Sequence, residues 1–202
     1  VVVLPGSRAT VDDLAWLRER GLDTAVAARA AAGRPVLGIC GGYQMLAESI
    51  VDDVESGAGP VSGLGLLPTR VAFAAEKVLA RPSGEWRGNP VRAYEIHHGS
   101  VTAPTELESF LDGVRAGSVW GTMWHGAFEN DAFRRAWLTE AAAQAGVGWT
   151  PVPDAPGFGE LREEMLDKLA DAIDEHLDAA TLLALLERGA PAGLPFVPPG
   201  AP

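Results

Sequence analysis

The segment GICGG at residues 38–42 has the residue types and spacing of a nucleophile on a strained turn. It follows a short apolar run and precedes a predicted helix from Tyr43 to Ser49. Glycines two residues before and after Cys40 allow the chain to turn tightly and the helix to pack closely, as in a nucleophile elbow. The helix N-terminus should also lower the cost of forming a thiolate. We interpret Cys40 as a nucleophile. The alternative is a small buried apolar residue, which is what most lone cysteines are.

A thiol nucleophile needs a base, and His125 is the best candidate. It comes directly after a predicted strand over residues 118–124, and α/β sites form where parallel strands end. A structural histidine is the alternative for His125. His97 and His98 could line a substrate pocket or simply end a strand, whereas His176 lies on an acidic helix and is given no chemical role.

The turn Pro5-Gly6-Ser7 follows the first predicted strand, so it should lie at the same edge of the sheet as Cys40. The backbone N–H groups of Gly6 and Gly41 could then form a two-donor oxyanion hole. An ordinary turn glycine is the alternative interpretation of Gly6.

The elements that would position these residues alternate between strands and helices. Val1–Leu4 and Val36–Ile39 are apolar runs typical of buried parallel strands. Two helices are predicted between them, over residues 10–21 with Thr10 as the N-cap and over residues 22–33. This order predicts an α/β fold with a mostly parallel sheet flanked by helices. Because the first residues already form an interior strand, we expect N-terminal strands to be missing from the chain.

The rest of the chain predicts further strands and then a helical extension. Residues 57–65 are predicted to be a loop, residues 66–79 and 91–96 strands, and residues 130–143 a helix. We expect three regions. They are a main domain over residues 1–145, a linker with C-terminal helices packing on that domain over 146–189, and a disordered Pro-rich tail over 190–202.

Composition narrows the possible functions. The chain has 202 residues, of which 47% are hydrophobic and 21% charged, which is typical of a globular domain. Its formal charge of −11 argues against a general nucleic-acid binder or a binder of anionic membranes. No apolar run reaches the ~20 residues of a spanning helix, so no membrane association is expected. A single cysteine fits a reducing, cytoplasmic location, and the four histidines have no metal-ligand spacing, so no metal site is expected.

Much of the negative charge lies in the last quarter of the chain. Residues 151–202 contain ten acidic residues against three basic ones. A solvated helix face that favours solubility is the simpler interpretation. A docking surface for a basic partner is the alternative.

Five blocks in this order resemble class I glutamine amidotransferases, and most closely the C-terminal amidotransferase domain of cobyric acid synthases, of cobyrinate type. The blocks are LPGS (4–7), GICGGYQML (38–46), GLGLL (63–67), YEIHHG (94–99) and GTMWHGAFEN (121–130), and the resemblance extends from residue 1 to about residue 186. It implies a flavodoxin-like sheet. It also implies that Cys40 attacks the side-chain amide of L-glutamine, that His125 is the base and acid, that Gly6 and Gly41 hold the oxyanion, and that Gln44 contacts glutamine.

The resemblance also implies a larger enzyme of cobalamin biosynthesis. An upstream synthetase domain of the same polypeptide would use ATP and Mg²⁺ to activate corrinoid carboxylates, converting adenosylcobyrinic acid a,c-diamide to adenosylcobyric acid with ammonia from glutamine. This chain has no P-loop motif, so we expect it to bind no cofactor of its own and to act alone at most as a glutaminase.

One position departs from the wider class I pattern. Ala127 stands where those enzymes place the glutamate of a Cys–His–Glu triad, so a Cys40–His125 dyad is expected. Two alternatives stay open: the glutaminase subunit of a lipid II amidotransferase, and a catalytically idle docking domain.

Overall fold

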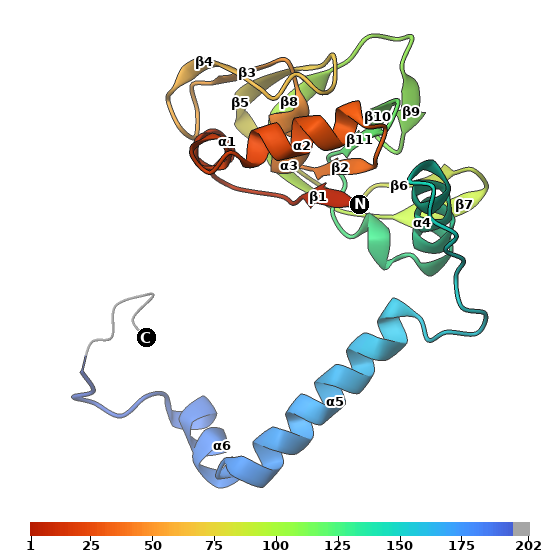
Figure 1. The fold of residues 1–202 in the computed structure, drawn as a ribbon. Coiled ribbons are helices and arrows are strands. Elements are labelled where there is room, and N and C mark those ends of the chain that lie inside the picture. The colour runs from red at the N-terminus through yellow and green to blue at the C-terminus, as the bar shows by residue number, and fades with distance from the viewer. Residues whose placement is uncertain (196–202) are drawn as a thin grey trace. The chain divides into compact units, whose positions relative to one another are not determined.

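A computed structural model of the chain describes residues 1–195 (Figure 1). The chain divides into an N-terminal unit, Val1–Ala155, and a C-terminal unit that begins at Pro156. Most of the predicted disordered tail, residues 196–202, lies outside the described residues.

A five-stranded sheet forms the centre of the N-terminal unit. Its order is β1-β2-β11-β10-β9, and the first three strands are parallel while the last two run antiparallel. The strands are β1 (Val2–Leu4), β2 (Val36–Ile39), β11 (Val119–Thr122), β10 (Gly113–Ala116) and β9 (Glu108–Phe110). The predicted apolar strands of the first forty residues are confirmed.

A second sheet has the order β4-β3-β5-β8, and only its β3–β5 pair is parallel. Its strands are β4 (Gly59–Ser62), β3 (Ser49–Asp52), β5 (Arg70–Ala80) and β8 (Glu95–Thr102), and a separate hairpin consists of β6 (Ser83–Trp86) and β7 (Asn89–Arg92). The α/β class is therefore confirmed, but the sheets are mixed and not mostly parallel.

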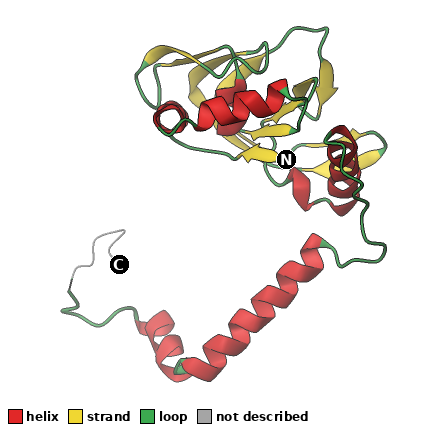
Figure 2. Ribbon diagram, viewed as in Figure 1, coloured by secondary structure: helices red, strands yellow, loops and turns green. Residues whose placement is uncertain are grey.

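Three helices belong to the first half of the chain and a fourth follows the last strand (Figure 2). They are α1 (Thr10–Glu19), α2 (Leu22–Ala31), α3 (Gly41–Leu46) and α4 (Asp131–Gln144). The short 3₁₀ helix η1 (Ala127–Glu129) precedes α4. The prediction of a helix reaching Ser49 was wrong, because α3 ends at Leu46 and β3 begins at Ser49.

Three other local predictions differ from the structure. The expected loop over residues 57–65 contains β4, which pairs with β3. β1 has a neighbour on one side only, so it lies at a sheet edge with Val1 and Val3 about half exposed, and it is not interior in this chain. Thr10 is the first residue of α1 and not its N-cap, because its hydroxyl is buried and donates to Gln44 Oε1.

The core consists of two clusters of buried side chains. One lies among α1, α3, β2 and the second sheet and includes Leu14, Val36, Tyr43, Leu46, Ile50 and Leu67. The other is largely aromatic and joins α4 to β9, β11 and the β6–β7 hairpin through Trp86, Phe110, Trp120, Phe133 and Trp137.

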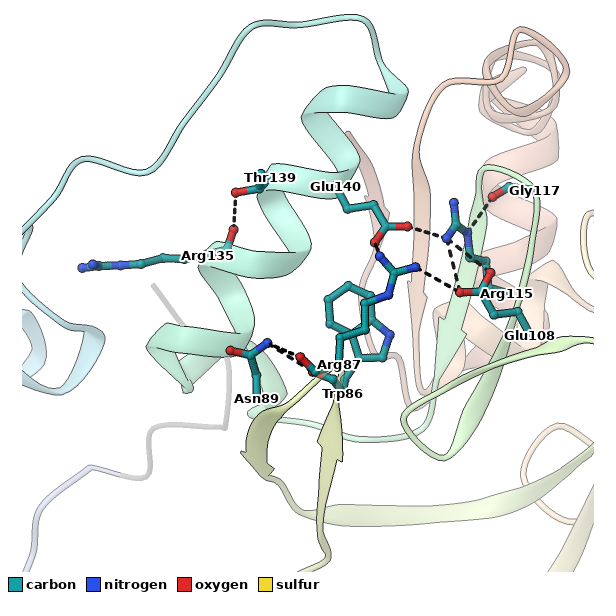
Figure 3. A network of polar contacts seen from close by, with 9 residues as sticks. All are labelled: Trp86, Arg87, Asn89, Glu108, Arg115, Gly117, Arg135, Thr139 and Glu140. Carbon is teal, nitrogen blue, oxygen red and sulfur yellow. Dashed lines mark hydrogen bonds and ion pairs between the residues drawn. The ribbon is translucent and has the colours of Figure 1, made fainter.

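A polar network borders this aromatic cluster (Figure 3). Glu140 of α4 contacts both Arg87 of the hairpin and Arg115 of β10, and Arg115 Nη1 lies 2.5 Å from Glu140 Oε1. Both arginines also contact Glu108 of β9. The Arg115 guanidinium also lies 4.5 Å from the ring centroid of Trp120, which belongs to the aromatic cluster. The network therefore connects α4, the β6–β7 hairpin, β9 and β10 beside this cluster.

The C-terminal unit contains two amphipathic helices, α5 (Phe158–His176) and α6 (Ala179–Arg188). The predicted cap of the last helix is confirmed, since Asp178 Oδ1 accepts the Ala180 N–H. The packing of these helices on the main domain stays a prediction. Within residues 1–195, no helix is both long and apolar enough to cross a membrane.

Candidate active site

Cys40 occupies the sharp turn between β2 and α3. Its backbone has φ +50° and ψ −113°, a conformation that costs energy for a residue with a side chain. The Cys40 N–H donates to Thr122 O at 2.8 Å, and the Cys40 carbonyl accepts from Gln44 N at 2.9 Å. The turn that the sequence predicts is therefore present, and it is anchored to the end of β11.

The flanking glycines are required by close backbone approaches. A Cβ on Gly38 would lie 2.7 Å from Tyr43 N, and one on Gly42 would lie 2.0 Å from Leu4 O. Neither position has room for a side chain, because β1, β2 and α3 meet there. This is the physical reason for the glycine spacing around Cys40.

Residues far apart in the sequence meet beside this turn. A Cβ on Gly6 would lie 2.7 Å from His125 Cε1 and 3.6 Å from Cys40 Cβ. A Cβ on Gly41 would lie 2.8 Å from Ser7 N, so the turn after β1 packs directly on the start of α3. The structure thus brings together Cys40, His125, Gly6 and Gly41, as expected from the ends of parallel strands.

A cavity of about 300 Å³ opens at this point. It is lined by the following residues: Gly6, Ser7, Arg8, Cys40, Gln44, Glu55, Phe73, Lys77, Ile96, His97, His98 and His125. The sequence analysis missed the charged lining residues Arg8, Glu55 and Lys77 as site residues. Their sequence neighbourhoods show no periodicity that separates them from other surface charges.

Gln44 and the two adjacent histidines contribute polar groups to the cavity. Gln44 is buried and its Oε1 accepts the Thr10 hydroxyl at 3.0 Å. His97 has a side chain only 9% exposed and neither ring nitrogen has a hydrogen-bond partner, while Glu95 Oε1 lies 4.0 Å from its Nε2. His98 Nδ1 lies 3.0 Å from Ala74 O. Both histidines line the cavity and lie within β8, not at its end.

The Cys40 thiol is protonated in the resting site. Burial raises the pKa of Cys40 to about 11, and the carboxylates of Glu55 and Asp112 act in the same direction. The Gly41 N–H and the Lys77 charge lower the pKa, but they are outweighed. The Gly41 N–H at the start of α3 thus lowers the cost of a thiolate, as expected, but desolvation of the thiol outweighs it in the free site.

His125 is suited to accept a proton. Burial lowers the pKa of its imidazole, and the neighbouring His97 lowers it further. His125 Nε2 is buried without a hydrogen-bond partner. Among residues 1–195 no carboxylate forms an ion pair with this ring, in agreement with the alanine at position 127.

Asp112 is a further acidic group near the site that the sequence did not reveal. Its carboxylate accepts the Thr122 hydroxyl at 2.5 Å and the Met123 N–H at 3.2 Å, and burial raises its pKa. It fixes the segment that leads from β11 to His125. No group of acidic, histidine or cysteine residues within the described part of the chain could hold a metal ion.

Comparisons with known proteins agree with this geometry. Residues 1–133 match the family model described as "CobB/CobQ-like glutamine amidotransferase domain". Cobyric acid synthases from Streptomyces avermitilis and Streptomyces coelicolor are 60% and 59% identical to the chain over 202 residues. The match covers all of the chain but only 40% of each relative, so the chain spans about two fifths of their length.

The cobyric acid synthase of Frankia casuarinae is 54% identical over 205 residues and shows the same partial coverage, 39% of its length. A solved structure titled "Crystal structure of glutamine amidotransferase" aligns with a TM-score of 0.53 at 22% identity, covering 72% of this chain and 78% of that one. This structural similarity supports the fold alone.

Proposed function

The chain belongs to the family of CobB/CobQ-like glutamine amidotransferase domains, and from this premise we propose that it is the glutaminase part of a cobyric acid synthase. The observation that carries the proposal is the meeting of Cys40, His125 and Gly6 around one cavity. A thiol on a strained turn, an uncharged imidazole and backbone donors are the groups that amide hydrolysis through a thioester requires.

The reaction begins from a neutral thiol and a neutral imidazole. His125 accepts the Cys40 proton as the sulfur attacks the side-chain carbonyl carbon of glutamine. The backbone N–H groups of Gly6 and Gly41 stabilise the oxyanion that forms. The intermediate collapses when the imidazolium gives its proton to the departing nitrogen, which releases ammonia and leaves a γ-glutamyl thioester. Water, deprotonated by His125, then hydrolyses the thioester to glutamate and restores the thiol.

The charges around the cavity suit a free amino acid. Arg8 and Lys77 supply positive charge that could pair with an α-carboxylate, and Glu55 supplies negative charge for an α-ammonium group. Gln44 also lines the cavity, where its amide can hydrogen-bond to the substrate. We assign L-glutamine as the substrate on this basis.

The fate of the ammonia follows from the relatives. Since the chain spans about two fifths of proteins named cobyric acid synthase, we propose that an upstream synthetase domain of the same polypeptide uses the ammonia. That domain would use ATP and Mg²⁺ to amidate carboxylates of the corrinoid substrate. This chain would carry no cofactor and act in the cytoplasm, as expected for a protein with one free thiol.

Release of glutamate from glutamine tests the proposal. The wild-type chain should release glutamate, and Cys40→Ala should abolish the release while leaving the circular dichroism spectrum unchanged. A glutamine-mimicking diazoketone should label one peptide, the one containing Cys40, because the chain has no other thiol. Labelling at another residue, or activity in the alanine variant, would contradict the assignment.

The absence of a triad carboxylate at Ala127 favours a second candidate, an idle docking domain. Such a domain would release no glutamate with or without its synthetase partner. A lipid II glutaminase subunit, in contrast, would release glutamate and would associate with a separate ligase.

A further inference from the structure

The imidazole of His125 has to be oriented by something other than a carboxylate. In a triad a carboxylate fixes the orientation and tautomer of the histidine. Here the corresponding position is Ala127, and His125 Nε2 is buried without a partner. A general base that rotates freely loses much of its effect, because proton transfer requires a hydrogen-bonded geometry.

Tyr94 contacts this histidine through both its ring and its backbone. The two rings are stacked, with centroids 5.0 Å apart and planes inclined by 13°. The two residues also exchange both backbone hydrogen bonds, Tyr94 N to His125 O at 3.0 Å and His125 N to Tyr94 O at 2.9 Å. This isolated bridge joins the residue before β8 to the segment after β11.

Two glycines lie directly beside the stacked rings. A Cβ on Gly126, whose φ is +71°, would lie 3.4 Å from Tyr94 Cε1, so the tyrosine ring covers the residue after His125 as well. On the side of the thiol, Gly6 leaves only enough room for the Cε1 edge of the imidazole. The imidazole is therefore confined by packing at one face and at one edge.

We propose that Tyr94 is the positioning residue of this site and holds the His125 imidazole in the orientation that a triad carboxylate would otherwise fix. The inference rests on the proposed glutaminase function. Stacking of this kind is strong enough to favour one ring orientation by about 2- to 12-fold. The two backbone hydrogen bonds between Tyr94 and His125 hold in place the main chain that carries the imidazole.

Tyr94 is well suited to mutational analysis because it is 47% exposed. Substitution there creates no buried cavity, and the backbone bridge does not depend on the side chain. Tyr94→Phe keeps the aromatic face and removes the hydroxyl, whereas Tyr94→Leu removes the ring. Trp149→Leu is a matched control, since Trp149 is also a partly exposed aromatic residue, 40% exposed, and does not line the cavity.

Steady-state kinetics of glutamate release provide the first measurement, made on the 202-residue chain. We expect Tyr94→Leu to lower kcat about 10- to 100-fold with little change in KM, since small misplacement of a catalytic group has effects of this size. Tyr94→Phe and Trp149→Leu should stay within about twofold of wild type, and all three should melt near the wild-type Tm. A kcat for Tyr94→Leu near that of wild type, or an equal loss in Tyr94→Phe, would overturn the inference.

Proton NMR of the imidazole signals provides a second measurement that needs no activity. The chain has four histidines, so the His125 Cε1 proton can be assigned by single substitutions. The Tyr94 ring should shift it upfield in wild type and in Tyr94→Phe, and Tyr94→Leu should lose this shift. If wild type releases no glutamate, the proposed function fails. If activity is present but the shift is unaffected by Tyr94→Leu, the positioning role alone fails.

Discussion

Cys40 and His125 have pKa values that keep both side chains uncharged in the empty site. Burial raises the pKa of the thiol and lowers that of the imidazole, so a resting thiolate–imidazolium pair is disfavoured from both sides. In the proposed mechanism, proton transfer therefore accompanies attack on the substrate, at the point where Gly6 and Gly41 would begin to stabilise the oxyanion. A site of this kind protects its thiol from oxidation and alkylation until glutamine is bound.

Alkylation of free Cys40 by iodoacetamide tests the raised pKa. We expect the rate constant in brief pulses to keep rising past pH 9 with a midpoint near 11, because only the thiolate reacts and its fraction grows with pH. The urea-unfolded chain should show the ordinary thiol midpoint, at about 8.5. A midpoint at or below the unfolded value in the folded chain would mean that the Gly41 N–H at the start of α3 outweighs the desolvation of the thiol.

The acidic limb of the pH profile of kcat/KM for glutamate release reports the protonation of His125. The base must be uncharged, and burial together with His97 lowers its pKa, so the limb should lie below pH 6.5. His97→Gln removes one cause of the lowering and should move the limb to higher pH. His176→Gln, on exposed α5, should leave it in place. A limb above pH 6.5 in wild type would contradict the desolvated environment of the imidazole.

At the scale of elements, the elbow depends on how closely β1 approaches α3. A Cβ on Gly42 would lie 2.0 Å from Leu4 O, which is backbone and cannot move without shifting β1. We expect Gly42→Ala to lower the free energy of unfolding by about 3 kcal/mol and to abolish glutamate release, since overpacking of this kind forces the backbone apart.

Gly148→Ala is the matched control for this substitution. Gly148 also belongs to the N-terminal unit, but a Cβ there meets nothing within 4 Å. Its free energy of unfolding, measured with urea, should change by no more than about 0.5 kcal/mol. Equal stability of the two alanine variants would show that β1 and α3 are not as closely packed as described.

The same elements show which parts of the fold are predictable from sequence. β2 and the turn at Cys40 were predicted because an apolar run followed by closely spaced glycines is compatible with few structures other than a buried strand and a tight turn. β3 and β4 were missed because each is only four residues long. Their strand character depends on pairing with each other and not on a local hydrophobic periodicity. The predicted N-cap at Thr10 failed for a similar reason, since the partner of its hydroxyl is Gln44, far along the chain.

The site was predictable to the extent that its residues come at the ends of strands. Cys40, His125, Gly6 and Gly41 were brought together by that rule. Asp112 and Tyr94 were not singled out, because their roles depend on three-dimensional contacts with the segment around His125. No local pattern distinguishes an aromatic residue that stacks on a histidine from one that packs in a core.

At the scale of the whole molecule, the site and the acidic C-terminal helices belong to different units. Every residue that lines the cavity precedes Ala155. The apolar side chains of α5 and α6 are not buried among the described residues, and most of the C-terminal acidic residues lie on or next to these helices. Within the structure described, the chemistry therefore depends on the N-terminal unit.

A chain that ends at Ala155 tests this division. That end keeps the hydrogen bond from Arg135 to the Ala155 carbonyl, 2.5 Å long, so the cut removes only residues from Pro156 onward. We expect kcat/KM for glutamate release to stay within about twofold of the 202-residue chain, because no cavity residue is lost. The Tm of the N-terminal unit should likewise be unchanged. A loss of activity together with a lower Tm would instead mean that α5 and α6 pack on the domain and support the site, as the sequence predicts.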